Sequence, residues 1–262
     1  MNEKPVVLAV GAHPDDIEFL MAGTLFLLKE KGFEIHYMNI GDGCCGSTTL
    51  SREEIAEVRV GEARKAADRL GAIWHPPIAH DLEIFYSNDL IKPMTQIIRQ
   101  INPHILLIHS LNDYMEDHTV SARICRTAAF LRNVPNFLPY QKDYVSKDLT
   151  IYHAQPLGNI TEMGNPVKPT IYVDITTVIN KKKDMLACHE SQRSWLQNKG
   201  MDEYLDSMEA AACQLGEWSG NYQFAEGFRQ HGHLGFCASD ADPLRDVLSD
   251  KMMISDNINS SV

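Results

Sequence analysis

The chain has 262 residues, of which 44% are hydrophobic and 23% are charged, as is typical of a globular protein with one large domain or two small ones. Asp and Glu together number 35 against 24 Lys and Arg, which gives a formal net charge of −11 without a prominent basic run. A nucleic acid or an anionic membrane surface is therefore disfavoured as a partner, because both require clustered positive charge.

The first apolar run, residues 6–10, is too short for the apolar segment of a signal peptide and far too short to cross a membrane. We therefore expect a buried strand here, a cytoplasmic protein and no membrane insertion. The six cysteines show no CxxC spacing, which favours reduced and mostly buried thiols. A redox or metal-binding role stays open for the adjacent pair Cys44 and Cys45, which lies in the glycine-rich loop 41–46.

Short apolar runs alternate with amphipathic stretches along the chain. In order, the pattern predicts a strand at 6–10, a helix at 17–31, a strand at 34–40, a helix at 51–70, a strand at 73–74, a helix at 90–101, a strand at 104–109, a helix at 119–131, strands at 151–155 and 170–173, and helices at 177–192 and 201–215. The helix at 51–70 has the clearest start, because Ser51 followed by Glu54 forms the pattern of a capping box.

This alternation predicts an α/β fold of three layers, Rossmann-like, in which a mostly parallel sheet has helices on both faces. We expect a single domain over residues 1–245 and a polar tail over residues 246–262. The loop after the first strand lacks the pattern Gly-x-Gly-x-x-Gly, so that a nucleotide-binding domain of the same fold class is disfavoured.

Three loops follow the carboxyl ends of predicted strands. They are residues 13–16 after the first strand, 41–46 after the second, and 112–118 after the strand that ends at His109. Ligands of such sheets bind beyond the carboxyl ends of the strands. We therefore expect the three loops to converge on one edge of the sheet.

The first of these loops carries residues that can bind a metal. Catalytic zinc usually has three protein ligands from histidine and carboxylate side chains, with water in the fourth position. His13 and Asp16 can point at one site, and His118 is the best third ligand because its loop meets the same sheet edge. The residues alone leave an alternative open, since Pro14 and the acidic residues also suit an ordinary helix start, with His118 in a structural role.

An ordered set of motifs along the chain resembles a known family. Ala12-His13-Pro14-Asp15-Asp16, followed by Gly23-Thr24-Leu25, is similar to the signature of the LmbE-like deacetylases, also called the PIG-L family. The later segments that resemble this family are Arg59-Val60-Gly61-Glu62 with Leu70-Gly71, Asp81, Asp117-His118, His189-Glu190-Ser191-Gln192 and Ala225-Glu226-Gly227-Phe228. These motifs reach from near the N-terminus to beyond residue 225.

The resemblance implies a zinc-dependent enzyme that removes the N-acetyl group from an N-acetylglucosamine-type sugar or glycoconjugate. The roles that it implies are zinc binding by His13, Asp16 and His118, general base catalysis by Asp15, and sugar binding by Arg59 and Asp81. Asp113 and Asp117 are candidates for hydrogen bonds to the ligand histidines, with turn capping as the alternative. Fe²⁺ or another divalent metal at the same ligands stays open, and the resemblance is compatible with a homo-oligomer.

One position departs from the family pattern. The second metal motif of the family is usually His-x-Asp-His, whereas Met115 occupies the first histidine position here. In the family this histidine stabilises the developing oxyanion or supplies a proton, and a thioether cannot donate a hydrogen bond. Tyr114 and His189 are the candidate replacements. The alternatives are an amidase for another N-acyl or sugar-thiol conjugate, or a metal- or sugar-binding protein of low activity.

Overall fold

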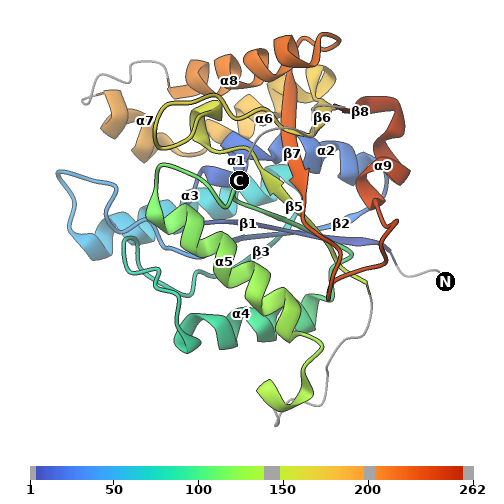
Figure 1. Cartoon of the computed structure of the whole chain (residues 1–262). Helices are drawn as coiled ribbons and strands as arrows, with labels where there is room; N and C mark the ends of the chain where they lie inside the picture. The colour runs from blue at the N-terminus through green and yellow to red at the C-terminus, as the bar shows by residue number, and fades with distance from the viewer. Residues whose placement is uncertain (1–3, 139–147, 198–203, 256–262) are drawn as a thin grey trace.

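The residues that the structure describes form an eight-stranded sheet in the order β3-β2-β1-β4-β5-β7-β6-β8 (Figure 1). The computed structural model describes residues 4–138, 148–197 and 204–255. Its strands are β1 (Val6–Gly11), β2 (Glu34–Asn39), β3 (Ile73–His75), β4 (Ile105–Ile108), β5 (Thr150–Ala154), β6 (Ile171–Asp174), β7 (Ala225–Gln230) and β8 (Met252–Ile254). Its α-helices are α1 (Asp16–Leu20), α2 (Ala22–Glu30), α3 (Arg52–Leu70), α4 (Asn88–Ile101), α5 (Glu116–Leu131), α6 (Ile179–Leu186), α7 (Glu190–Gln197), α8 (Tyr204–Ser219) and α9 (Pro243–Leu248).

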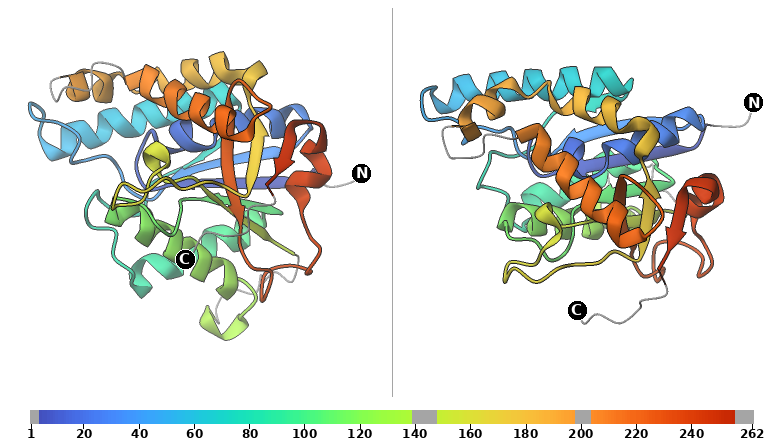
Figure 2. Two further views of the ribbon diagram at one scale, coloured as in Figure 1. Left: turned by 45° about the horizontal axis from the view of Figure 1, so that its top comes forward. Right: turned by 90° about the horizontal axis from the view of Figure 1, so that it is seen from above.

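The sheet separates two layers of helices, as Figure 1 and Figure 2 show. Strands β3, β2, β1, β4 and β5 are parallel, and β7, β6 and β8 extend the sheet with antiparallel pairing. Successive residues of β1 face opposite sides, as the twofold repeat of a strand requires. Val7 and Ala9 pack with α1, α2, α3, α6 and α8, whereas Leu8 and Val10 pack with α4 and α5. The three-layer α/β fold is therefore confirmed.

The helix expected over residues 17–31 is divided in two. Met21 has φ −147° and ψ 0°, and the chain starts a second helix directly after it. The backbone N–H groups of Gly23 and Thr24 donate to the Glu226 carboxylate at 2.8 and 2.7 Å, so a carboxylate about 200 residues later in the chain caps α2. Lys182 Nζ lies 2.5 Å from the same carboxylate and neutralises it inside the core.

The second half of the chain differs most from the expectation. Helix 177–192 is replaced by a short 3₁₀ turn at Thr176–Val178, then α6 and α7, and the expected start of helix 201–215 lies outside the described residues. Strands β7 and β8 and helix α9 were not expected. Part of the polar tail is ordered, because β8 pairs with β6 and Leu248 of α9 is fully buried in the core.

The start of α3 confirms the capping box. The backbone N–H of Glu54 donates to Ser51 Oγ at 3.3 Å, and the backbone N–H of Ser51 donates to Glu54 Oε2 at 2.9 Å. We expect Ser51→Ala to lower the free energy of unfolding by about 1 kcal/mol, because the Glu54 N–H of the first turn loses its acceptor, Ser51 Oγ. Urea denaturation measures the change, with the exposed Thr48→Ala as a control that should have little effect.

The described residues include no helix that is both long enough and apolar enough to cross a membrane.

Candidate metal centre

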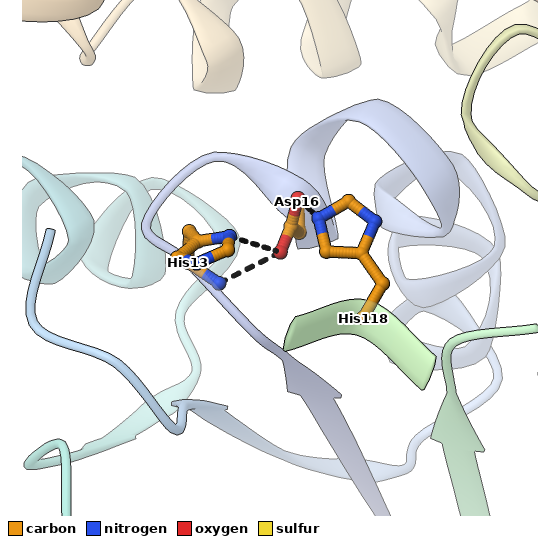
Figure 3. A group of neighbouring side chains, drawn as sticks. All are labelled: His13, Asp16 and His118. Carbon is orange, nitrogen blue, oxygen red and sulfur yellow. Dashed lines mark hydrogen bonds and ion pairs between the residues drawn. The ribbon is translucent and has the colours of Figure 1, made fainter. Parts of the chain in front are cut away.

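Three side chains meet beyond the carboxyl ends of β1 and β4. His13 lies in the loop after β1, Asp16 opens α1, and His118 lies in the first turn of α5. Figure 3 shows them pointing toward one another, and their donor atoms all lie within 4.8 Å. All three residues are buried, with 6%, 6% and 2% exposure respectively. The expected convergence of the first and third loops thus places two imidazoles and one carboxylate together.

The separations between these donors fit a tetrahedral metal ion. His118 Nε2 lies 3.3 Å from Asp16 Oδ1, and His13 Nδ1 lies 3.7 Å from Asp16 Oδ2. A tetrahedral zinc with bonds of about 2.0–2.1 Å separates its ligand atoms by about 3.3 Å, so only small adjustments are required. The donor set also matches the histidine and carboxylate ligands that zinc uses in catalytic sites.

A carboxylate holds each of the two imidazole rings from behind. His13 Nε2 lies 2.9 Å from Asp117 Oδ2, which also accepts the backbone N–H of Leu82 at 2.7 Å. His118 Nδ1 lies 3.0 Å from Asp113 Oδ1. A ring nitrogen that donates to a carboxylate leaves the other nitrogen free as a metal ligand, and this arrangement surrounds many protein metal sites. The free nitrogens are His13 Nδ1 and His118 Nε2, which are the two that face Asp16.

The charges of the cluster favour an ionised Asp16. Burial alone would raise the pKa of Asp16, but His118 and His109 lower it well below its usual range. Burial alone would lower the pKa of His118, but the Asp16 and Asp113 carboxylates raise it to about 10. The raised pKa values of His13 and His118 and the lowered pKa of Asp16 thus have one cause, the mutual attraction of opposite charges in the cluster.

Asp15 occupies a strained position next to this cluster. Its φ of 109° lies in the left-handed region, where residues other than glycine are uncommon. Its Oδ2 accepts a hydrogen bond from the Tyr204 hydroxyl at 2.7 Å, and its Oδ1 lies 3.6 Å from Arg59 Nη2. Burial raises the pKa of Asp15, and the Arg59 guanidinium only partly offsets this effect. Backbone strain that the surroundings maintain is common at functional sites.

Arg59 and Asp81 lie beside the cluster but are largely covered, with 4% exposure each. Arg59 Nη2 donates to the Pro14 carbonyl at 2.6 Å, and its Nη1 lies 3.5 Å from Asp81 Oδ2. Asp81 Oδ1 accepts the backbone N–H of Gly43 at 2.6 Å. In this conformation the two residues join the loop after β1 to the loop 41–46, instead of presenting their charges to an open site.

The two candidates for the missing hydrogen-bond donor lie in different surroundings. Tyr114 is 58% exposed, and its ring meets the edge of the His118 ring at a centroid distance of 5.9 Å. His189 is fully buried, and its Nε2 lies 3.3 Å from Glu18 Oε1. Glu18 is itself bonded by the Tyr37 hydroxyl at 3.1 Å. Tyr114 is therefore on the solvent side of the cluster, whereas His189 is enclosed in the core beside Glu18.

Two further residues contact the cluster or the neighbouring Asp15 and were not predicted from the sequence, namely His109 and Tyr204. His109 follows β4, stacks on His118 at a centroid distance of 4.2 Å, and places Nε2 3.0 Å from Asp16 Oδ2. The sequence could have indicated His109, because it follows the carboxyl end of a central strand, and ligands of such sheets bind at this edge. The same rule predicted His118. Tyr204 comes from α8 and carries no motif, so that only the folded structure reveals its bond to Asp15.

Asp113 gives a direct test of the contacts behind the imidazoles. We expect Asp113→Asn to weaken metal binding by about 10–100-fold, because the charge that holds His118 Nδ1 is lost while the side-chain size is kept. Titration against a competing chelator measures the affinity. Asp89→Asn, an exposed change on α4, is the control, and equal affinities in the two variants would contradict the role of Asp113.

Known proteins match both the sequence and the fold. Residues 8–129 match the family model described as PIG-L, GlcNAc-PI de-N-acetylase. Diacetylchitobiose deacetylase of Thermococcus kodakarensis is 28% identical over 234 residues, which cover 87% of this chain and 84% of that protein. The 4-oxalmesaconate hydratase of Pseudomonas putida is 27% identical over 197 residues, which cover 71% of this chain and 73% of that protein.

Among solved structures, the N,N'-diacetylchitobiose deacetylase of Pyrococcus horikoshii superimposes with a TM-score of 0.74 at 25% identity. The superposition covers 92% of this chain and 89% of that one. The sequence matches and the superposition thus point to the same family as the motifs along the chain. The resemblance is confirmed, because the PIG-L (LmbE-like) family model matches residues 8–129 and deacetylases are among the similar proteins.

Proposed function

We propose that this protein is a metal-dependent hydrolase that removes the N-acetyl group from an N-acetylglucosamine-type sugar or glycoconjugate. The observation that carries the proposal is the donor set of His13, Asp16 and His118 with Asp15 fixed beside it. The diacetylchitobiose deacetylases among the relatives support the substrate class. Zinc fits the donor set, and when bound there it would polarise the acyl carbonyl and promote ionisation of water.

Asp15 is the proposed general base. Its raised pKa brings it closer to the neutral range in which a base can both take and return a proton. We propose that it takes the proton of the water that attacks the acetyl carbonyl carbon, and then gives a proton to the departing amine. Tyr204 and Arg59 hold the carboxylate in place from two sides. The products are acetate and a free amino sugar.

Tyr114 is the proposed donor to the oxyanion in place of the histidine that Met115 replaces. Partial desolvation of its hydroxyl, together with the negative charges of Asp16 and Asp113, raises the pKa of Tyr114 to about 12, so that this hydroxyl keeps the proton that a hydrogen bond requires. His189 is the less favoured candidate, because the Glu18 carboxylate faces its ring and no part of it is exposed. Arg59 and Asp81 are proposed to act on the sugar indirectly, by holding the loops around it.

We expect Tyr114→Phe to lower kcat about a hundredfold with little change in KM, because the lost bond would form mainly in the transition state. Steady-state kinetics on the best N-acetyl sugar measures both constants. Tyr86→Phe is a suitable control, since the Tyr86 hydroxyl pairs with Thr127 more than two turns along α5 from His118. An unchanged kcat in Tyr114→Phe would remove this residue from the mechanism.

The experiment that tests the function is an amine-release screen on N-acetyl amino sugars. The full chain is stripped of metal by a chelator and then restored with Zn²⁺ or Fe²⁺. We expect release of free amine only after metal is restored. Metal binding without turnover on any N-acyl sugar or sugar-thiol conjugate would instead favour a binding protein of low activity.

The hydratase among the relatives provides a second candidate function, because addition of water to a carbon–carbon double bond also requires a positioned base. The same metal-restored protein is therefore offered 4-oxalmesaconate, the compound in that relative's name. Loss of the conjugated absorbance without amine release from any sugar would favour hydration over deacetylation.

A further inference from the structure

A second group of metal-ligand side chains lies on the neighbouring loops. Asp42 and Cys44 belong to the loop 41–46 after β2, and His80 belongs to the segment after β3. The donor atoms of the three residues lie within 4.8 Å of one another. Asp42 and Cys44 are buried, with 8% and 4% exposure, whereas the His80 side chain is 60% exposed. The group is therefore assembled inside the loop and open to solvent on its histidine side.

The three donors are of different chemical kinds. Asp42 offers a carboxylate oxygen, Cys44 a sulfur and His80 an imidazole nitrogen, a combination typical of sites for zinc and other thiophilic divalent ions. We propose that these residues form a second cation site, selective for thiophilic divalent ions such as Zn²⁺ and Cd²⁺. It is distinct from the centre at His13, which contains no sulfur, and it does not depend on the proposed function.

The backbone around the group already holds the donors together. Gly41 and Ala79 form a parallel bridge between the two segments, and Cys44 N–H donates to Asp42 Oδ1 at 3.0 Å. His80 Nδ1 lies 2.5 Å from Asp42 Oδ2. A cation that replaces the proton between these two atoms would have to separate them by about 1 Å, because the ligands of one zinc ion lie about 3.3 Å apart. The exposed His80 side chain permits this movement, and the backbone bridge already holds the two segments together, which lowers the entropic cost of binding.

Binding requires the Cys44 thiol to lose its proton. Burial and the Asp42 carboxylate raise the pKa of Cys44 to about 12, so the thiol is protonated until a cation displaces the proton. Arg52 Nε lies 3.1 Å from Cys44 Sγ and would donate a hydrogen bond to the thiolate that remains. The guanidinium thus stabilises the charged form of the Cys44 ligand.

The adjacent cysteine provides a matched control. Cys45 Sγ lies 3.9 Å from Cys44 Sγ, but the Cys45 thiol is directed to the Asp81 carbonyl at 3.7 Å. Cys45 does not share the group formed by Asp42, Cys44 and His80. Removal of one thiol or the other therefore separates a specific site from general binding to a pair of cysteines.

The test is a titration of the metal-free full chain with Cd²⁺, followed by the thiolate-to-cadmium charge-transfer absorption in the ultraviolet. We expect the band in the unmodified protein, in His13→Ala and in Cys45→Ala, and no band in Cys44→Ala. His80→Ala is an exposed change that should not disturb folding, and it should weaken cadmium binding by more than about tenfold. Loss of a residue that only hydrogen-bonds a metal ligand already lowers metal affinity by about tenfold or more, and His80 is proposed to bind the metal directly.

A protein without the band, or a band that survives Cys44→Ala, would overturn the proposal. A band lost in Cys45→Ala but not in Cys44→Ala would do the same. Because the absorption reports only sulfur ligands, it is independent of the centre at His13. Absence of deacetylase activity would therefore leave this result intact, and loss of the band would leave the proposed function intact.

Discussion

Replacing Asp15 by asparagine should lower kcat for amide hydrolysis on the order of a thousandfold while the metal stays bound. The reason is that Asp15 is the proposed base, but its side chain is not part of the donor set. Asparagine is the right replacement for this position, because it tolerates the left-handed backbone that φ 109° imposes. Its side-chain oxygen can still accept the Tyr204 hydroxyl, so the local structure should be kept.

Steady-state kinetics and metal content measured on the same preparation test this expectation. Asp89→Asn provides the control, because it removes an exposed carboxylate from the first turn of α4 without touching the site. Unreduced turnover in Asp15→Asn would sink the assignment of the base. Loss of the metal together with activity would show instead that Asp15 supports the donor set.

His13→Ala should lose both the metal and the activity. One of the three proposed ligands disappears. Its partner Asp117 then keeps, among the bonds within the described residues, the one from the Leu82 N–H. The remaining Asp16 and His118 cannot hold zinc in the geometry that catalysis needs. We expect activity at background level even when zinc is added at a concentration that saturates the unmodified protein.

Metal content after gel filtration, measured in a Cys44→Ala background so that the second proposed site adds no zinc, and amine release give the two readouts. His233→Ala, which removes an exposed histidine far along the chain, should retain both. Unchanged zinc content in His13→Ala would mean that a different set of residues binds the metal. The pair at His109 and Asp113, which also lies within 4.8 Å of His118, would then be the first alternative.

The first half of the fold and the place of the site could be predicted because their signals are local. Alternating strands and helices up to residue 131, the Ser51 capping box and the position of His13 at a strand end all depend on near neighbours in sequence. Because ligands of parallel sheets bind beyond the carboxyl ends of the strands, His118 could be predicted to lie near His13 before any contact was known.

The remainder depends on contacts between distant parts of the chain. At the break after Met21, the Glu226 carboxylate accepts the first N–H groups of the second helix. The spacing of apolar residues near Met21 cannot predict this contact, because Glu226 lies about 200 residues later in the chain. The insertion of β7 between β5 and β6, and the pairing of β8 at the edge, are set by tertiary packing. That Arg59 binds the sugar stays a prediction. Its guanidinium donates to the Pro14 carbonyl and lies 3.5 Å from Asp81, and a motif identifies a residue but not the direction of its side chain.

The same distant contacts determine when, during synthesis, the site can form. Residues 13–16 leave the ribosome early, but the hydroxyl that fixes Asp15 belongs to residue 204, and the carboxylate that caps α2 belongs to residue 226. Native pairing over such a separation is slow to form, because a long loop must close first. A nascent chain that already contains every proposed metal ligand would thus still lack the support of its base, and the site would be completed only after residue 226 has been translated.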